Sequence, residues 1–131
     1  MLERQVLELA TGPNFVAFTT LLPDGSPMTH LTWVGVDDDR EHLLINTELH
    51  RAKYKNAARD PRVTVLLFGH DNPYHWAEVR GRVAGEIRGD MARAHIDELA
   101  RKYTGEDYAS PITSERVILR IEPARQVLSA R

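Results

Sequence analysis

Three cationic side chains, Arg51, Lys53 and Lys55, lie at the start of a predicted short helix. This helix separates two strand-like segments, Leu43–Thr47 and Val63–Phe68. Cationic side chains beside the free backbone N–H groups of a helix N-terminus form a natural phosphate site. Cations at this end oppose the helix macrodipole, so they lower stability unless an anion offsets them. We therefore expect a phosphate group at the start of this helix.

Two polar residues, Asn46 and Thr47, come just before this helix and offer further hydrogen-bond donors. A guanidinium and an ammonium group together hold a doubly charged phosphate well. The alternative is that the basic residues form an ordinary solvated helix face, as such clusters usually do. A phosphate site in a small β-rich chain favours a phosphorylated cofactor over a purely structural role.

A second segment with chemical potential is Thr29–Trp33, which combines hydroxyl groups, an imidazole and an indole. One interpretation is a half-buried strand with ordinary alternation. The other is a flat aromatic ligand lying along the strand, held by backbone N–H groups, Thr32 and Trp33. The run Tyr74–Trp76 likewise fits a ligand pocket, a protein interface or packing at the rim of a barrel.

Several kinds of site are not supported by the sequence. The six histidines show no metal-ligand spacing, and there is no cysteine for thiol chemistry, disulfides or metal binding. No Gly-x-Ser-x-Gly, Gly-x-Gly-x-x-Gly or Walker motif occurs. A nucleotide-like cofactor must therefore bind in another way, and we expect no metal.

Composition points to one globular domain, expected over residues 1–131. Hydrophobic residues make up 42% of the chain, and 17 basic and 19 acidic residues give a net charge of −2. This balance gives no general attraction to nucleic acid or to an anionic membrane. No apolar run approaches the roughly 20 residues of a membrane helix, and the first ten residues are too charged for a signal peptide. We expect a cytoplasmic protein.

Periodicity and turn residues predict six strands and two or three short helices. Asp90 is expected to cap the last helix. Gly81 or Gly85 is expected to bend the longest strand. Pro123 is expected to interrupt the final strand, which then continues along an edge over 125–128. The helices are expected at 2–10, 51–60 and 90–103, and the strands at 14–22, 27–36, 42–47, 62–68, 74–87 and 116–121.

Two of these strands, Phe15–Leu22 and Val63–Phe68, look apolar on both faces. Burial on both faces suits a closed barrel better than an open sheet with one wet face. The sequence therefore predicts a mainly β, six-stranded barrel.

The order of these motifs resembles the pyridoxamine 5′-phosphate oxidase-like superfamily, the FMN-binding split β-barrels, over nearly the whole chain. The short length and the run 72–83 resemble the branch of flavin and deazaflavin oxidoreductases that uses coenzyme F-420. The segments that carry the resemblance are Phe15–Leu22, Pro23–Pro27, Thr32–Val36, Leu43–Thr47, Arg51–Lys53 with Asn56, Asp60–Val63, Glu78–Val83 and Arg116–Ile121.

The resemblance implies a homodimer with two cofactor sites at the subunit interface. It places a phosphate at Arg51 and Lys53, with the other residues around the cofactor and Trp76 reaching the partner's site. The residues that it implies for cofactor binding are His30, Leu31, Thr32, Trp33, Asn46, Thr47, Arg51, Lys53, Asn56 and Trp76.

The implied activity is hydride transfer from reduced F-420 to an unsaturated small molecule. The mechanism would depend on orientation and exclusion of water, because no residue stands out as a catalytic acid. Alternatives are an FMN-dependent oxidoreductase, a non-catalytic flavin or deazaflavin carrier, and a haem-binding split barrel. The chain lacks the C-terminal Trp and Arg extension of true pyridoxamine phosphate oxidases, which argues against vitamin B6 oxidation.

Overall fold

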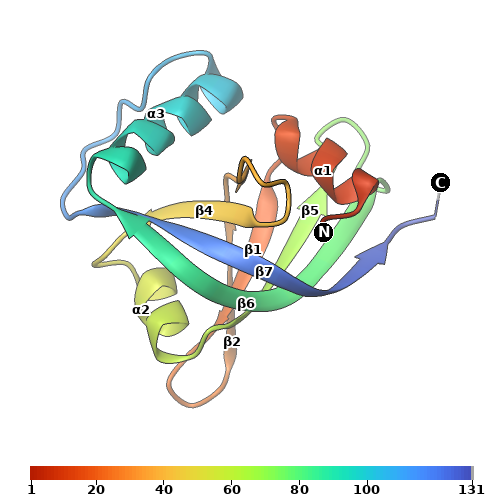
Figure 1. The fold of residues 1–131 in the computed structure, drawn as a ribbon, viewed down its shortest axis with the longest axis horizontal. Coiled ribbons are helices and arrows are strands. Elements are labelled where there is room, and N and C mark those ends of the chain that lie inside the picture. Colours follow the sequence, from red (N-terminus) through yellow and green to blue (C-terminus); the bar gives the residue numbers. More distant parts are fainter. Residues whose placement is uncertain (131) are drawn as a thin grey trace.

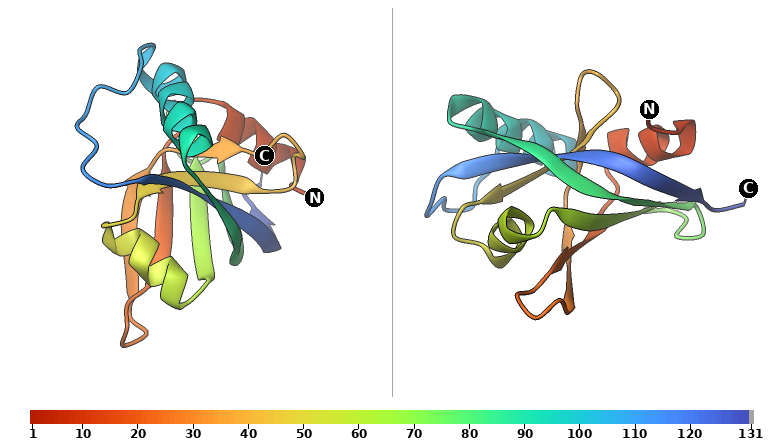
Figure 2. Two further views of the ribbon diagram at one scale, coloured as in Figure 1. Left: turned by 60° about the vertical axis from the view of Figure 1, so that its left-hand side comes forward. Right: turned by 60° about the horizontal axis from the view of Figure 1, so that its bottom comes forward.

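An antiparallel sheet of seven strands curls around the core of the protein in the computed structural model, which describes residues 1–130. Helices α1 and α3 lie on one side of the long, bent β6–β7 ribbon and α2 lies on the other (Figure 1 and Figure 2). Arg131, the end of the expected domain 1–131, lies outside the described residues. The helices are α1 (Arg4–Thr11), α2 (Ala52–Arg59) and α3 (Asp90–Thr104), and the strands are β1 (Val16–Leu21), β2 (Pro27–Thr32), β3 (Gly35–Val36), β4 (Leu43–Glu48), β5 (Arg62–Phe68), β6 (Trp76–Arg88) and β7 (Arg116–Leu128).

The two edges of the sheet are consecutive in the sequence. The strand order is β2-β1-β5-β6-β7-β4-β3, yet β2 and β3 are joined by only Trp33 and Val34. The sheet must therefore curl until its edges nearly meet, which gives the split-barrel shape. The prediction of one strand over 27–36 was wrong, because the chain leaves β1 after Thr32 and pairs with β4 from Gly35. This division adds the two-residue β3 to the six predicted strands.

The concave face of the sheet carries the main core. In β5 the buried residues are Val63, Val65 and Leu67, whereas the intervening Leu66 is 37% exposed. The expectation of burial on both faces of this strand was therefore wrong, and the alternation shows one face turned to the core. Helix α1 completes the packing with Val6, Leu9 and Ala10, which are buried in the same cluster.

The long strand β6 is bent by two irregularities, at Arg80/Gly81 and Val83/Gly85, as predicted. A Cβ atom on Gly81 would lie only 2.1 Å from the carbonyl oxygen of Glu122, so this close approach requires glycine. Strand β7 passes through Pro123 without the predicted interruption. It pairs with β4 only as far as Ile121, so beyond that point one side is free and proline is tolerated.

Helix α3 begins differently from the prediction. Its N-cap is Gly89, with φ of 78° and no side-chain capping bond, whereas Asp90 lies inside the first turn. There the carboxylate complements the helix macrodipole without capping it. Among residues 1–130, no helix is both long and apolar enough to cross a membrane.

Candidate functional site

A cavity of about 230 Å³ lies across the line where the two edges of the sheet approach each other. Its walls come from both sides of that line, from β2 and Trp33 on one side and from β4 and the start of α2 on the other. Residues of α3 and of the loop before β7 close it. It brings together seven of the predicted cofactor residues, which are Leu31, Thr32, Trp33, Asn46, Thr47, Arg51 and Lys53.

The basic residues of α2 divide between the cavity and the solvent. Arg51 is the N-cap of α2 and Lys53 lies in its first turn; both line the cavity, whereas Lys55 is exposed. The Lys53 side chain is buried, and its ammonium makes no hydrogen bond or ion pair with any of residues 1–130. Burial, together with the nearby charges of Arg51 and Arg116, lowers the pKa of Lys53. A bound anion would relieve this cost.

A buried carboxylate, Glu48, holds two guanidinium groups beside the cavity. Its Oε2 lies 3.4 Å from Arg51 Nη2 and 3.3 Å from Arg116 Nη1, and Glu48 is only 1% exposed. Its Oε1 accepts hydrogen bonds of 2.8 Å from the backbone N–H groups of Thr113 and Ser114. Burial raises the pKa of Glu48, but these N–H groups and the two guanidiniums outweigh it and lower the pKa. Glu48 is therefore an ionised structural anchor.

Two buried polar atoms that belong to cavity-lining residues have no hydrogen-bond partner among residues 1–130. They are Thr47 Oγ1 and Arg116 Nη1. Buried donors are normally paired, so unpaired ones indicate a missing partner. Together with the unpaired Lys53, they offer donors to one anionic group. The residues present therefore fit the phosphate of a cofactor.

Asn46 fixes the orientation of Arg116. Its Oδ1 accepts a hydrogen bond of 2.9 Å from Arg116 Nε. Its Nδ2 donates to the carbonyl oxygen of Ala92 and lies 3.0 Å from His95 Nδ1. The Asn46 amide is thus bound on both sides and cannot turn over without losing these bonds.

An aromatic cluster forms the opposite side of the site. Trp33 stacks on Tyr103 with centroids 5.1 Å apart and planes inclined by 8°, and Tyr108 meets Trp33 edge-on at 6.2 Å. Phe15 packs against Tyr103 at 5.5 Å. Such a wall suits a flat, conjugated ligand better than a flexible one.

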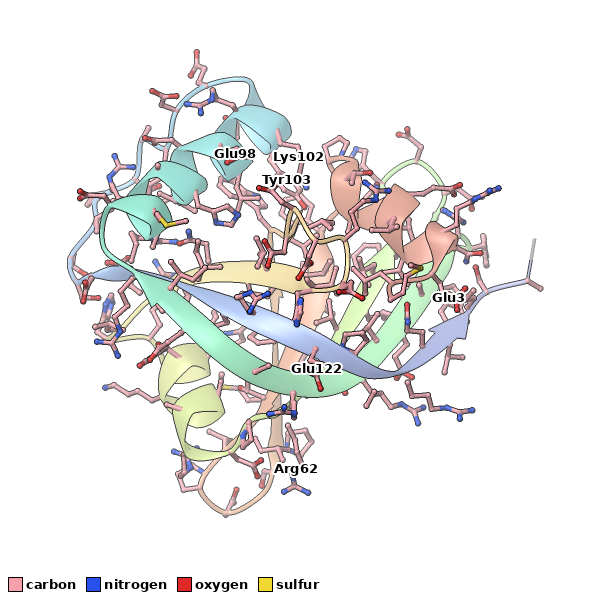
Figure 3. The ribbon with its side chains drawn as sticks, viewed as in Figure 1. Glu3, Arg62, Glu98, Lys102, Tyr103 and Glu122 are labelled. Carbon is pink, nitrogen blue, oxygen red and sulfur yellow. The ribbon has the colours of Figure 1, made fainter. Side chains whose placement is uncertain are left out.

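Helix α3 is tied to the link between β2 and β3 through its C-terminal residues. The Tyr103 hydroxyl donates to the carbonyl of Asn14 at 2.6 Å and accepts from the N–H of Val34 at 3.1 Å. Lys102 Nζ donates to the carbonyls of Ala10 and Val34 at 2.8 and 2.6 Å. Figure 3 shows Lys102 and Tyr103 between α3 and α1. These bonds hold Trp33, and therefore the aromatic wall, in place.

Three predicted cofactor residues lie outside the lining of this cavity. Asn56 is buried and donates to Thr20 Oγ1 at 3.1 Å, while its Oδ1 accepts from Arg59 at 2.7 Å. His30 is exposed on β2. Trp76 lines a separate groove on the outer face of β5, β6 and β7. The cavity of one chain therefore does not include these side chains.

Glu48, His95, Tyr103 and Tyr108 were not predicted as site residues, and Arg116 was predicted only as part of a strand. Their roles depend on contacts between segments far apart in the chain. The pairing of Glu48 with Arg116 across β4 and β7 is such a contact. No local spacing signals it.

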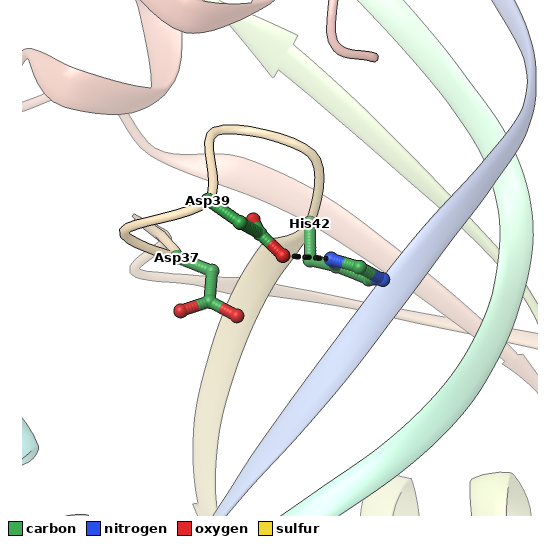
Figure 4. A group of neighbouring side chains, drawn as sticks. All are labelled: Asp37, Asp39 and His42. Atoms are coloured by element: carbon green, nitrogen blue, oxygen red, sulfur yellow. Dashed lines mark hydrogen bonds and ion pairs between the residues drawn. The ribbon is translucent and has the colours of Figure 1, made fainter.

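A group of potential metal ligands, Asp37, Asp39 and His42, lies after β3 (Figure 4). The guanidinium of Arg120 already lies against all three: Nε is 2.9 Å from Asp37 Oδ2, and Nη2 is 3.2 Å from both Asp39 Oδ2 and His42 Nδ1. The positive charge that a metal would supply is therefore provided by the chain itself.

Residues 2–128 match the family model described as pyridoxamine 5′-phosphate oxidase. Among solved structures, an F-420 reductase is 29% identical, with 92% of this chain and 94% of that chain covered and a TM-score of 0.79. A conserved hypothetical protein from Mycobacterium tuberculosis is 25% identical over 96% of this chain and 82% of its own, with a TM-score of 0.72. No curated protein matches the sequence.

A pyridoxamine 5′-phosphate oxidase-related, FMN-binding protein from Nostoc punctiforme shares the fold. It is 16% identical over 87% of this chain and 72% of its own, with a TM-score of 0.63.

Proposed function

The chain belongs to the pyridoxamine 5′-phosphate oxidase family, and from this premise we propose that it is an oxidoreductase that transfers a hydride from reduced coenzyme F-420 to an unsaturated small-molecule acceptor. The observation that carries the proposal is the buried, unpartnered cation Lys53 in a cavity that also has an aromatic wall. The similarity to an F-420 reductase over most of both chains supports the choice of cofactor.

In this proposal the two ends of the cavity have different tasks. The cofactor phosphate is bound by Lys53, Arg51 and Thr47, together with the free N–H groups of the first turn of α2. The backbone and side chains of Leu31, Thr32 and Trp33 orient the ring. His30, Asn56 and Trp76, which lie outside the cavity of one chain, act on cofactor binding from further away or from a second subunit.

The reduced deazaflavin supplies the hydride when it is bound, and the chain's own residues orient it and exclude water. Two ionisable side chains of the site, Tyr103 and Glu48, are poorly suited to donate a proton. Burial raises the pKa of Tyr103 to about 12, although the N–H of Val34 opposes this, and Glu48 is held ionised. We therefore propose that solvent supplies the proton. An alanine scan that finds one side chain essential for turnover but not for cofactor binding would contradict this.

A second candidate, an FMN-dependent oxidoreductase, is favoured by the charges of the site. Arg51, Lys53 and Arg116 provide three positive charges against one carboxylate, that of Glu48, which leaves two. A phosphate monoester such as that of FMN carries close to two negative charges at neutral pH, since its second pKa is about 6. A phosphodiester, as in F-420, carries only one negative charge at its phosphate. The two surplus positive charges therefore match the phosphate of FMN better than that of F-420.

We also propose that the protein works as a homodimer. The outer face of β5, β6 and β7 carries a groove of about 500 Å³ lined by Leu66, Phe68, Trp76 and Val127, among others. Such apolar exposure on a sheet is typical of an interaction surface. A second copy on this face would bury it and bring Trp76 toward the partner's site. In sedimentation experiments we expect the wild type to be a dimer and Leu66→Glu to be a monomer. A monomeric wild type would contradict the proposal.

The decisive experiment is titration of the purified protein with FMN and with F-420 side by side, followed by fluorescence. Quenching of F-420 at lower concentrations than FMN supports the deazaflavin proposal, and the reverse order supports FMN. Turnover is then assayed with enones and quinones. Binding without any hydride transfer would favour a carrier, and failure to bind either cofactor would refute the proposed function.

A further inference from the structure

We propose that Arg116 is a third anion-binding residue of the cavity, held in its binding position by Glu48, Asn46 and His95. The inference rests on the proposed function in that it concerns the same cavity. It adds a residue from the C-terminal strand to a site otherwise built from β2, β4 and α2. It also gives His95, which does not line the cavity, a positioning role.

The Arg116 side chain is buried but incompletely paired. It is 5% exposed and lines the cavity, while its Nη1 has no hydrogen-bond acceptor among residues 1–130. Glu48 lies 3.3 Å from that nitrogen but shares its charge with Arg51. The Tyr108 ring lies under the guanidinium at 5.2 Å, which fixes its plane. A rigid, buried and incompletely paired guanidinium is well suited to bind an anion.

The hydrogen bonds of Asn46 connect Arg116 to His95. Its oxygen must accept from Arg116 Nε, because a guanidinium only donates. Its nitrogen therefore faces Ala92 and His95, and an amide nitrogen only donates. Consequently His95 Nδ1 must accept, and the imidazole must be neutral with its proton on Nε2. A Cβ on Gly35 would lie 3.0 Å from that nitrogen, so the ring packs closely against the start of β3.

The charges around His95 come from several elements. Glu98 and Lys102 are on α3 with it, and Arg116 is on β7. Asp37 and Asp38, which follow β3, line a groove together with His95. Burial lowers the pKa of His95, opposed by Glu98 and assisted by Lys102 and Arg116. The neutral form is therefore favoured in the folded protein.

Protonation of His95 would place an N–H group against the donor nitrogen of Asn46. The added positive charge would by itself attract an anion, but the repulsion between the two donors disturbs the amide that holds Arg116 Nε. We expect the loss of this orientation to dominate, so anion affinity should fall as the pH is lowered below the pKa of His95. A residue with only a structural role would not give this pH dependence.

The test measures the dissociation constant for FMN between pH 5 and 8. Arg116→Gln is expected to bind FMN about 10- to 100-fold more weakly, since a hydrogen bond to a charged group contributes roughly 1.5–3 kcal/mol. Arg120→Gln is the matched control, because Arg120 lies on the same face of β7 but is already paired with Asp37 and Asp39. It should bind FMN as the wild type does.

The positioning role is tested with His95→Gln, whose side-chain oxygen can still accept from Asn46 but does not titrate. The ratio of the variant's affinity to that of the wild type cancels the titration of FMN itself. This ratio is expected to rise about tenfold or more between pH 8 and pH 5. A ratio that stays constant with pH would overturn the role of His95.

Other outcomes separate this inference from the proposed function. If Arg116→Gln binds FMN within twofold of wild type, Arg116 is not an anion ligand, and the proposed function survives. If Arg116→Gln does not fold, Arg116→Lys, which keeps the charge but lacks the Nε donor, should still weaken FMN binding, and unchanged affinity would refute the inference. If wild type binds inorganic phosphate in an Arg116-dependent way but neither cofactor, the inference holds and the proposed function fails.

Discussion

Two arginines on one face of β7 have opposite surroundings. Arg120 is 30% exposed and its guanidinium lies against Asp37, Asp39 and His42. Arg116 is nearly fully buried and shares one carboxylate with Arg51, and its Nη1, 3.3 Å from Glu48 Oε2, has no hydrogen-bond acceptor among residues 1–130. A cation in partial contact with water usually needs little pairing, and a buried one needs much. Here the more exposed Arg120 has two carboxylate partners, whereas the buried Arg116 shares one carboxylate with Arg51.

This reversal indicates which of the two clusters is built to bind a ligand. The Arg120 cluster holds the turn after β3 and has no positive charge left to offer, because two carboxylates face one guanidinium. The Arg116 cluster keeps a surplus of positive charge inside a cavity, where only an anion from outside can balance it. A buried surplus of charge is thus a better indicator of a binding site here than a cluster of potential ligands.

The largest expected effect comes from removing the carboxylate of the buried cluster. Glu48→Gln should lower the free energy of unfolding by about 3–5 kcal/mol, because it leaves Arg116 buried without a counter-charge. The pKa of Glu48 is lowered in the folded protein, so its stabilisation is present at neutral pH and is lost as the pH falls through that pKa. Urea denaturation of the variant and the wild type at pH 7 and pH 4 measures the loss of stability and its dependence on pH. A variant as stable as wild type at pH 7 would show that the cluster does not need this carboxylate.

The next effect concerns binding and not stability. Lys53→Ala should weaken binding of the phosphate-bearing cofactor by roughly 1.5–3 kcal/mol, the range for a charge-assisted hydrogen bond. Lys55→Ala is the matched control on the same helix, since Lys55 is exposed and outside the cavity. Fluorescence titration gives both dissociation constants. Equal effects of the two changes would mean that α2 attracts the cofactor only by its general charge.

The smallest effect is expected in the Arg120 cluster. Asp37→Asn should lower the free energy of unfolding by about 1 kcal/mol or less, because Arg120 keeps Asp39 as a partner and is accessible to water. Cofactor affinity should not change. A loss of stability comparable to that of Glu48→Gln, measured in the same urea series, would remove the contrast between the two clusters.

The parts of the fold that depend on local patterns could be predicted from the sequence. The turn at Asp24 and Gly25 is one example: Gly25 has φ of 85°, and Ser26 N donates to Asp24 Oδ1 at 2.9 Å. The short helix α2 and its two cavity-lining cations, Arg51 and Lys53, are others. In each case residues close in sequence carry the physical reason for the structure.

The parts that depend on contacts between distant segments could not be predicted. The crossing from one sheet edge to the other at Trp33 looks in the sequence like an uninterrupted strand. Arg116 becomes a site residue only through its register with Glu48 and its bond to Asn46. Asn56 follows Lys53 by one helical turn, but its bond to Thr20 turns it away from the cavity. Contacts between segments far apart in the chain decide all three outcomes.

The meeting of both sheet margins at Trp33 and Val34 has a consequence for motion. A molecule seated between Thr32 on one edge of the sheet and Asn46 and Thr47 near the other would connect the two edges directly. Its arrival should slow amide exchange in β2, β3 and β4 together, although these strands are not all neighbours in the hydrogen-bonded ladder. Binding in one small cavity would then slow amide exchange in strands at both edges of the sheet.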